Sequence, residues 1–187
     1  MKRIGVLALQ GDVREHLTIL ETLDVEAVSV KRPADLSDIA GLVIPGGEST
    51  TIGKMAVRFG LLEPLRTAID DGLAVYGTCA GMILLAGAVM EGDQPLIGAL
   101  DVVVRRNAFG RQNESFEAEL DIAGLSSPFH AVFIRAPWIE KVGGDVEVLA
   151  QVDEHPVMVR HDRILATSFH PELTGDGRIH EMLLELT

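Results

Sequence analysis

The chain has a single cysteine among its 187 residues, and aromatic side chains make up only 4% of it. One cysteine excludes an internal disulfide, which fits a reducing compartment. Because 47% of the residues are nevertheless hydrophobic, the core has to consist mainly of Val, Ile, Leu and Ala, as in buried parallel strands and their helices. Basic residues are also few: 16 against 28 acidic ones give a net charge of −12. This charge argues against non-specific binding of nucleic acid and against docking on an anionic membrane.

Long apolar runs are lacking as well. No run approaches the roughly 20 apolar residues that a membrane span needs. The apolar run at 4–9 is too short for a signal peptide and predicts a first strand. We therefore expect a soluble, cytoplasmic protein with no membrane partner. The length predicts one domain, residues 1–187, large enough for a full core.

The order of the expected elements predicts an α/β fold. In the first half, expected strands alternate with expected helices, which implies a parallel sheet with helices on both faces. These strands are 4–9, 25–30, 41–44 and 73–76, and the helices are 12–23, 48–59, 62–70 and 82–89. Later strands are expected at 96–105, 115–122, 131–134, 146–152, 156–160 and 164–168, and a last helix at 177–186. Short connections among the later strands indicate hairpins. We predict a mostly parallel sheet flanked by helices, with an antiparallel extension.

The lone cysteine lies in Gly77-Thr78-Cys79-Ala80-Gly81, after an apolar run and before a helical stretch. This pattern is typical of a nucleophile elbow, in which glycines permit a strained strand-to-helix turn that exposes the middle side chain. A sulfur at a helix N-terminus is favoured as thiolate, the form that attacks carbonyl carbon. The alternative interpretation is a small buried hydrophobic residue.

A second segment, Ser168-Phe169-His170-Pro171-Glu172, follows another apolar run. Proline disfavours helical geometry in the preceding residue, so His170 is expected to be extended, with Glu172 pointing to the same side. Glu172 would then orient the His170 ring as a general base for Cys79. Taken alone, the tripeptide is better interpreted as a surface turn with a chance carboxylate. Together with the cysteine elbow it predicts a catalytic triad.

The segment Pro45-Gly46-Gly47-Glu48-Ser49-Thr50 also follows a strand and begins a helix. It lacks the Gly-Lys-[Ser/Thr] of a phosphate-binding loop. We interpret it as part of an oxyanion hole, with one backbone N–H from Gly47 and one from Ala80 beside the cysteine. A tight turn with a capping hydroxyl is the simpler reading, and both can hold.

The pair Arg105-Arg106 ends an expected strand, where two arginines usually form a solvated edge, but one of them could bind a substrate carboxylate. Arg135 is a similar candidate, and the residues alone leave both interpretations open. Metal binding is poorly supported. His180-Glu181 begins a zinc-protease pattern, but Leu184 occupies the second histidine position. The remaining histidines show no ligand spacing and are interpreted as surface or structural residues: His16, His130, His155 and His161. We expect no metal and no cofactor.

Taken together, these motifs resemble the glutaminase subunits of pyridoxal 5'-phosphate synthases, within the class-I, triad-type glutamine amidotransferases. The matching segments run through nearly the whole chain. They are Leu7-Ala8-Leu9-Gln10-Gly11, Arg14-Glu15-His16, the Gly-Gly-Glu-Ser-Thr loop, the cysteine elbow, Arg106-Asn107, Gly110-Arg111-Gln112, Ser115-Phe116-Glu117, Phe133-Ile134-Arg135-Ala136-Pro137 and Phe169-His170-Pro171-Glu172-Leu173. Many amidotransferases share the elbow and the His-Pro-Glu, whereas the Gly-Gly-Glu-Ser-Thr and Gly-Arg-Gln segments point to this branch.

The resemblance implies a function and a set of site residues. Cys79 would be the nucleophile, completed by His170 and Glu172. L-Glutamine would be bound by Gly47, Glu48, Ser49, Arg106, Ile134 and Arg135. Ammonia would pass to a separate synthase subunit in a mixed hetero-oligomer, where the glutaminase is nearly idle until docked. Asp12 departs from the small residues more common in the family. If the first helix lies at the interface with the synthase subunit, Asp12 is expected to affect docking rather than chemistry.

Two other functions remain open from the residues alone. The first is a non-catalytic regulator with Cys79 as a redox switch, since an accessible low-pKa thiol also suits oxidation. The second is a different amidase, or an amidotransferase that serves another acceptor, because the identity of the acceptor is a property of the synthase.

Overall fold

A seven-stranded sheet runs through the computed structural model, which describes residues 1–109 and 115–187. The strand order is β10-β11-β12-β4-β3-β1-β2. The five strands from β12 to β2 are mutually parallel, and β10 and β11 add an antiparallel hairpin at one edge. The strands are β1 (Arg3–Leu7), β2 (Glu26–Val30), β3 (Gly41–Ile44), β4 (Ala74–Thr78), β10 (Glu147–Val152), β11 (His155–His161) and β12 (Ile164–Thr167). The predicted fold class is confirmed. The Gly110-Arg111-Gln112 segment lies outside the described residues.

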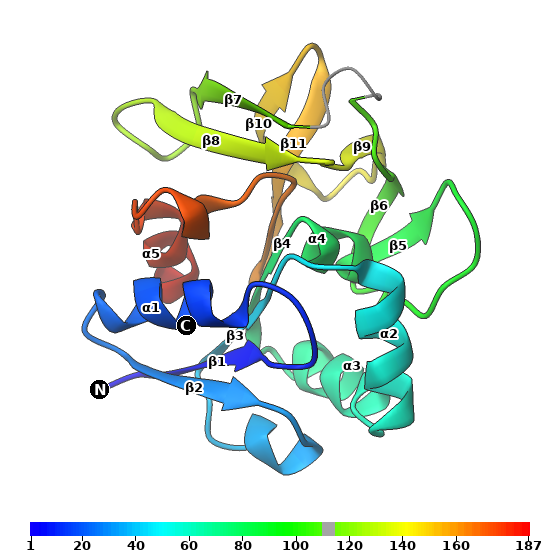
Figure 1. Ribbon diagram of the computed structural model, residues 1–187, viewed down its shortest axis with the longest axis vertical. Coiled ribbons are helices and arrows are strands. Elements are labelled where there is room, and N and C mark those ends of the chain that lie inside the picture. Colours follow the sequence, from blue (N-terminus) through cyan, green and yellow to red (C-terminus); the bar gives the residue numbers. More distant parts are fainter. Residues whose placement is uncertain (110–114) are drawn as a thin grey trace.

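Helices cover both faces of this sheet (Figure 1). Helices α1 and α5 pack on one face, and α2, α3 and α4 on the other. Their bounds are Val13–Glu21 (α1), Ser49–Arg58 (α2), Leu62–Asp70 (α3), Ala80–Leu85 (α4) and Arg178–Glu185 (α5), and Pro33–Leu36 forms a 3-10 turn, η1. Along β3 and β4, alternate side chains enter the two cores: Val43 and Tyr76 face α1 and α5, whereas Leu42 and Val75 face the other helices. Each buried strand therefore presents apolar side chains on both faces.

Two smaller sheets lie beside the central one. A three-stranded sheet contains β5 (Ala86–Val89), β6 (Leu100–Arg105) and β9 (Trp138–Val142), and a two-stranded ribbon contains β7 (Ser115–Leu120) and β8 (Phe129–Ile134). The expected helix at 82–89 is wrong in its second half, because residues 86–89 pair with β6 instead. A glycine at position 87 weakens the helix, so the backbone pairing offered by β6 prevails. Strand β9 was not predicted. No helix in the described ranges combines the length and apolarity of a bilayer span.

The carboxyl ends of four adjacent parallel strands meet at one edge of the central sheet. In the sheet order β12-β4-β3-β1, the loops that follow these strands carry His170, Cys79, Gly47 and Gln10. Loops at this edge are where open α/β sheets bind their ligands. Strand polarity alone therefore brings together segments that are far apart in the sequence.

Candidate active site

Cys79 occupies a strained turn between β4 and α4. Its φ of 48° and ψ of −99° are unusual for a residue with a side chain. Its N–H donates a hydrogen bond of 2.7 Å to the carbonyl of Thr167, the last residue of β12. The flanking glycines are required sterically: a Cβ on Gly81 would lie 2.1 Å from the Ile44 carbonyl oxygen, and one on Gly77 would lie 2.6 Å from the Gly81 carbonyl carbon. The elbow therefore needs glycine at both positions, because the backbone of one segment packs directly against the backbone of another.

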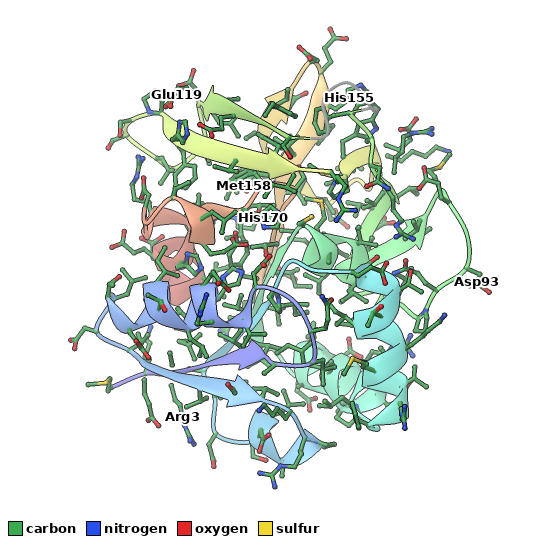
Figure 2. All side chains as sticks on the ribbon, viewed as in Figure 1. Arg3, Asp93, Glu119, His155, Met158 and His170 are labelled. Atoms are coloured by element: carbon green, nitrogen blue, oxygen red, sulfur yellow. The ribbon has the colours of Figure 1, made fainter. Side chains whose placement is uncertain are left out.

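His170 and Glu172 lie on the loop after β12, with the imidazole near the middle of the molecule (Figure 2). The Nδ1 of His170 lies 2.6 Å from Oε1 of Glu172. The side chain of His170 is 6% exposed and that of Glu172 is fully buried. His170 has the non-helical backbone expected before proline, but Pro171–Leu173 forms a 3-10 turn, η3. The carboxylate thus reaches the ring through a turn, and the expected route along an extended segment is wrong.

The surroundings of His170 favour its protonated form. Burial lowers the pKa of the imidazole, but its interactions with Cys79 and Glu172 outweigh burial and raise the pKa to about 10. Burial raises the pKa of the Glu172 carboxyl, and the hydrogen bond with His170 opposes this. Both pKa shifts describe the same proton, which lies between Nδ1 of His170 and Oε1 of Glu172, 2.6 Å apart. We place that proton on His170, because a charged N–H donating to a carboxylate makes the stronger bond.

Asp12, the residue before α1, lies beside the same imidazole. Its Oδ2 is 3.5 Å from Nδ1 of His170, and its side chain is 37% exposed. The donor atoms of Asp12, His170 and Glu172 lie within 4.8 Å of one another, a spacing that a metal ion could use. A cation there would have to replace the proton between His170 and Glu172, so we assign these three side chains to hydrogen bonding around the imidazole and not to a metal site. A change at Asp12 acts on the imidazole directly, which sequence reasoning had not anticipated.

Cys79 and His170 border one cavity of about 350 Å³. The structure brings to its wall every residue that was predicted to bind glutamine: Gly47, Glu48, Ser49, Arg106, Ile134 and Arg135. Two of them are already paired, since Arg106 Nη2 lies 3.1 Å from Glu48 Oε1. Glu48 also accepts hydrogen bonds from the backbone N–H groups of Thr50 and Thr51 at the start of α2. Burial works to raise the pKa of Glu48, but these bonds and Arg106 hold it below its usual value.

Three further cavity residues were missed: Gln10, Ile83 and Asn107. The Oε1 of Gln10 accepts the N–H of Glu48 at 2.8 Å and so fixes the loop after β3. Its signal in the sequence was its place after the first strand, at the same sheet edge as the cysteine. Gly47 has a φ of 152°, and its missing Cβ leaves room for the Gln10 side chain. Ala80, the other expected oxyanion donor, is buried as the first residue of α4.

Comparison with known proteins gives consistent results. Residues 6–187 match the model of the SNO glutamine amidotransferase family. A relative from Frankia alni, named "Pyridoxal 5'-phosphate synthase subunit PdxT", is 61% identical over 187 residues, which cover 98% of this chain and 94% of the relative. A relative of the same name from Streptomyces coelicolor is 58% identical, with 98% and 92% covered.

Solved structures resemble the fold over its whole length. A structure described as a glutamine amidotransferase is 51% identical to this chain and has a TM-score of 0.94. The match covers 98% of this chain and 97% of the other. The structure of PurLQS from Thermotoga maritima has a TM-score of 0.67 at 17% identity, with 98% of each chain covered. The second likeness concerns the fold alone.

Proposed function

The chain belongs to the SNO glutamine amidotransferase family, and we propose that it is the glutaminase subunit of a pyridoxal 5'-phosphate synthase. In this role it hydrolyses L-glutamine to L-glutamate and ammonia, and the ammonia passes to the synthase subunit. Curated relatives that carry the synthase name match this chain over nearly its full length. The observation that carries the chemistry is the elbow cysteine that shares a cavity with His170, while Glu172 holds the other side of the ring.

The first half of the proposed reaction forms a thioester. The sulfur of Cys79 attacks the side-chain amide carbon of glutamine, and the carbonyl oxygen becomes an oxyanion. Backbone N–H groups at Gly47 and Ala80 are proposed to stabilise this charge. His170 then gives its proton to the amide nitrogen, the C–N bond breaks and ammonia leaves. A pKa near 10 keeps a proton available on His170 for this step.

The second half releases glutamate. After ammonia has left, His170 is neutral and takes a proton from water, which attacks the thioester carbon. The C–S bond breaks, and the proton on His170 restores the resting pair with the sulfur. Throughout, Glu172 holds the imidazole in the tautomer that presents Nε2 to the reacting atoms.

The charges on the cavity wall suit the two ends of a free amino acid. The guanidinium groups of Arg106 and Arg135 match an α-carboxylate, and the carboxylate of Glu48 matches an α-ammonium group. We propose that these residues, with Gly47, Ser49 and the backbone at Ile134, bind glutamine. The ion pair between Arg106 and Glu48 fixes both charges before substrate arrives.

The remaining parts of the proposal concern the assembly. We propose that residues 1–187 act as one cytoplasmic glutaminase domain that docks on a synthase subunit in a mixed hetero-oligomer. The loop at Gly46-Gly47 is proposed to adopt its donating conformation on docking, since peptide flips are easy at paired glycines. A structure of the free subunit with both donors already directed at the oxyanion position would argue against this.

The test uses the chain together with its synthase subunit and compares wild type with Cys79→Ala. We expect Cys79→Ala to lose glutamine-dependent formation of pyridoxal 5'-phosphate but to keep formation driven by added ammonia. The retained ammonia reaction is the control for folding and docking. Normal glutamine turnover by Cys79→Ala would end the triad assignment. Failure of the wild-type chain to support either reaction with the synthase subunit would refute the assigned partner.

A further inference from the structure

A row of buried polar groups lies behind Glu172, on the side away from the cavity. The outer oxygen of Glu172, Oε2, is buried and has no hydrogen-bond partner among the described residues. The Nε2 of His16, on α1, lies 3.6 Å from this oxygen, and both side chains are fully buried. The same Nε2 lies 3.2 Å from Oγ1 of Thr78, while Nδ1 of His16 lies 2.9 Å from Nε2 of His180, on α5.

Both histidines are neutral. Burial, with the nearby His180 and His170, lowers the pKa of His16 well below its usual value, and burial lowers the pKa of His180 to about 3. A neutral imidazole carries one N–H, so one proton lies in the contact between the two rings. Either His180 donates from Nε2 to His16, or His16 donates from Nδ1 to His180.

The surroundings of Nδ1 of His180, the last group of the row, distinguish these two arrangements. The Nδ1 of His180 is buried without a hydrogen-bond partner in the described part of the chain. If His16 donated, the proton of His180 would sit on this nitrogen as a buried, unpaired N–H, an arrangement that folded proteins avoid. A bare nitrogen of His16 would also face the Glu172 carboxylate. If His180 donates, both problems disappear.

We propose that His16 is a positioning residue that donates its Nε2–H to Thr78 and directs the same N–H dipole at the outer oxygen of Glu172, 3.6 Å from Nε2, with its tautomer fixed by His180. The proposal rests on the proposed glutaminase function. His16 does not touch the substrate cavity; it acts through Glu172, which acts on His170. The N–H stabilises the ionised carboxylate, whereas burial and the charge of Asp12 favour the neutral carboxyl.

Other groups around Glu172 do not replace this donor. His170 bonds to the other oxygen, the backbone N–H of Glu172 itself lowers the pKa of the carboxyl, and the negative charge of Asp12 raises that pKa. None of these groups gives the outer oxygen a hydrogen bond. Burial and the charge of Glu172 raise the pKa of Tyr76, and its hydroxyl is engaged with Oγ1 of Thr167 at 2.9 Å. The Tyr76 ring packs edge-on against both His16 and His180 and closes the row.

A first experiment needs no activity. In the full chain labelled with ¹⁵N-histidine, nitrogen NMR reports which ring nitrogens carry protons. We expect His16 and His180 both to be protonated on Nε2 and bare on Nδ1 at neutral pH. A proton on Nδ1 of His180 would overturn the proposal, whether or not the chain proves to be a glutaminase.

A second experiment measures the pH dependence of glutamine hydrolysis in the complex with the synthase subunit. His16→Leu removes the donor, and His16→Gln restores an N–H near the position of Nε2. Because the N–H dipole of His16 favours the ionised form of Glu172, its loss raises the pKa of this buried carboxyl. The acid limb of kcat, which we take to report the ionisation of Glu172, should therefore move to higher pH by about one unit in His16→Leu. We expect kcat to fall by up to about tenfold at pH values below the limb and to change little above it. The KM for glutamine should be unchanged, and most of the loss should be recovered in His16→Gln.

The matched control is His130→Leu, which removes an exposed histidine on β8 that bonds to Glu117 and Glu119. It should leave the pH profile unchanged. A His16→Leu enzyme that loses activity without any movement of the acid limb, or a His16→Gln enzyme as impaired as His16→Leu, would reduce His16 to a packing role and refute the proposal. If His16→Leu does not fold, the NMR measurement still decides.

Discussion

Replacing Gly81 by Ala is expected to disable the elbow while leaving most of the fold in place. The added Cβ would lie 2.1 Å from the Ile44 carbonyl oxygen, whereas ordinary contact begins at 3.4 Å. The start of α4 and the end of β3 must therefore separate by about 1.3 Å, a displacement of the size that costs roughly 100-fold in rate when it misplaces a reacting group. Overpacking of this kind also costs about 1–3 kcal/mol of stability.

The measurement is glutamate release from glutamine by the complex with the synthase subunit, together with the melting temperature of the isolated chain. For a domain of this size, the stability cost lowers the melting temperature by roughly 2–12 °C. Gly144→Ala is the matched control, since a Cβ there meets no atom within 4 Å. It should match wild type in both measurements.

Three outcomes bear on this reasoning. A Gly81→Ala enzyme that is folded and about 100-fold slower would support the conclusion that the close packing of α4 on β3 holds Cys79 in position. Turnover within about threefold of wild type would refute it, because no rearrangement of 1.3 Å could then be reaching the sulfur. Equal losses in Gly81→Ala and Gly144→Ala would show that the effect is not specific to the elbow.

Further expectations concern the triad and the cavity wall. Glu172→Ala should lower turnover less than Cys79→Ala, because the carboxylate acts through His170; steady-state assays of both variants compare them, and equal losses would contradict this order. Arg106→Ala should raise the KM for glutamine more than it lowers kcat, and a fall in kcat alone would argue against a binding role. The pKa of His170 is about 10 when folded against 6.5 for the free group. Its stabilisation is therefore complete below pH 6.5 and is lost as the pH rises through 10. Urea unfolding should show that wild type is more stable than His170→Asn, and that this difference in the free energy of unfolding becomes smaller toward alkaline pH. A difference that does not change with pH would contradict the raised pKa of His170.

The elements predicted best are those whose burial can be recognised from the local pattern of apolar residues. Strand β3 and helix α3 begin and end where expected, at Gly41–Ile44 and Leu62–Asp70. An apolar run between turn residues and an amphipathic repeat are both local signals. The strand at Ala86–Val89 could not be predicted, because its conformation depends on pairing with β6, which is a tertiary contact. The polar residues of β9 gave no apolar run to recognise.

The site shows the same division. Two motifs with local signatures, at Cys79 and His170, were enough to predict that a sulfur and an imidazole meet. His16 was interpreted as a surface or structural residue, although it lies one helical turn from both Val13 and Leu20 and so on the buried face of α1. That spacing predicts burial. It does not predict which polar groups lie across the interface, because Glu172 and His180 come from distant parts of the chain.

The place of β12 in the middle of the sheet, between β11 and β4, has a consequence for biosynthesis. A ribosome delivers Cys79 long before His170, and until β12 emerges the edge of β4 has no neighbour on that side. On the proposed mechanism an incomplete chain cannot hydrolyse glutamine, yet it exposes an unpaired apolar edge that favours wrong pairing with other nascent chains. Activity and protection from aggregation arrive together, when the last strand is inserted.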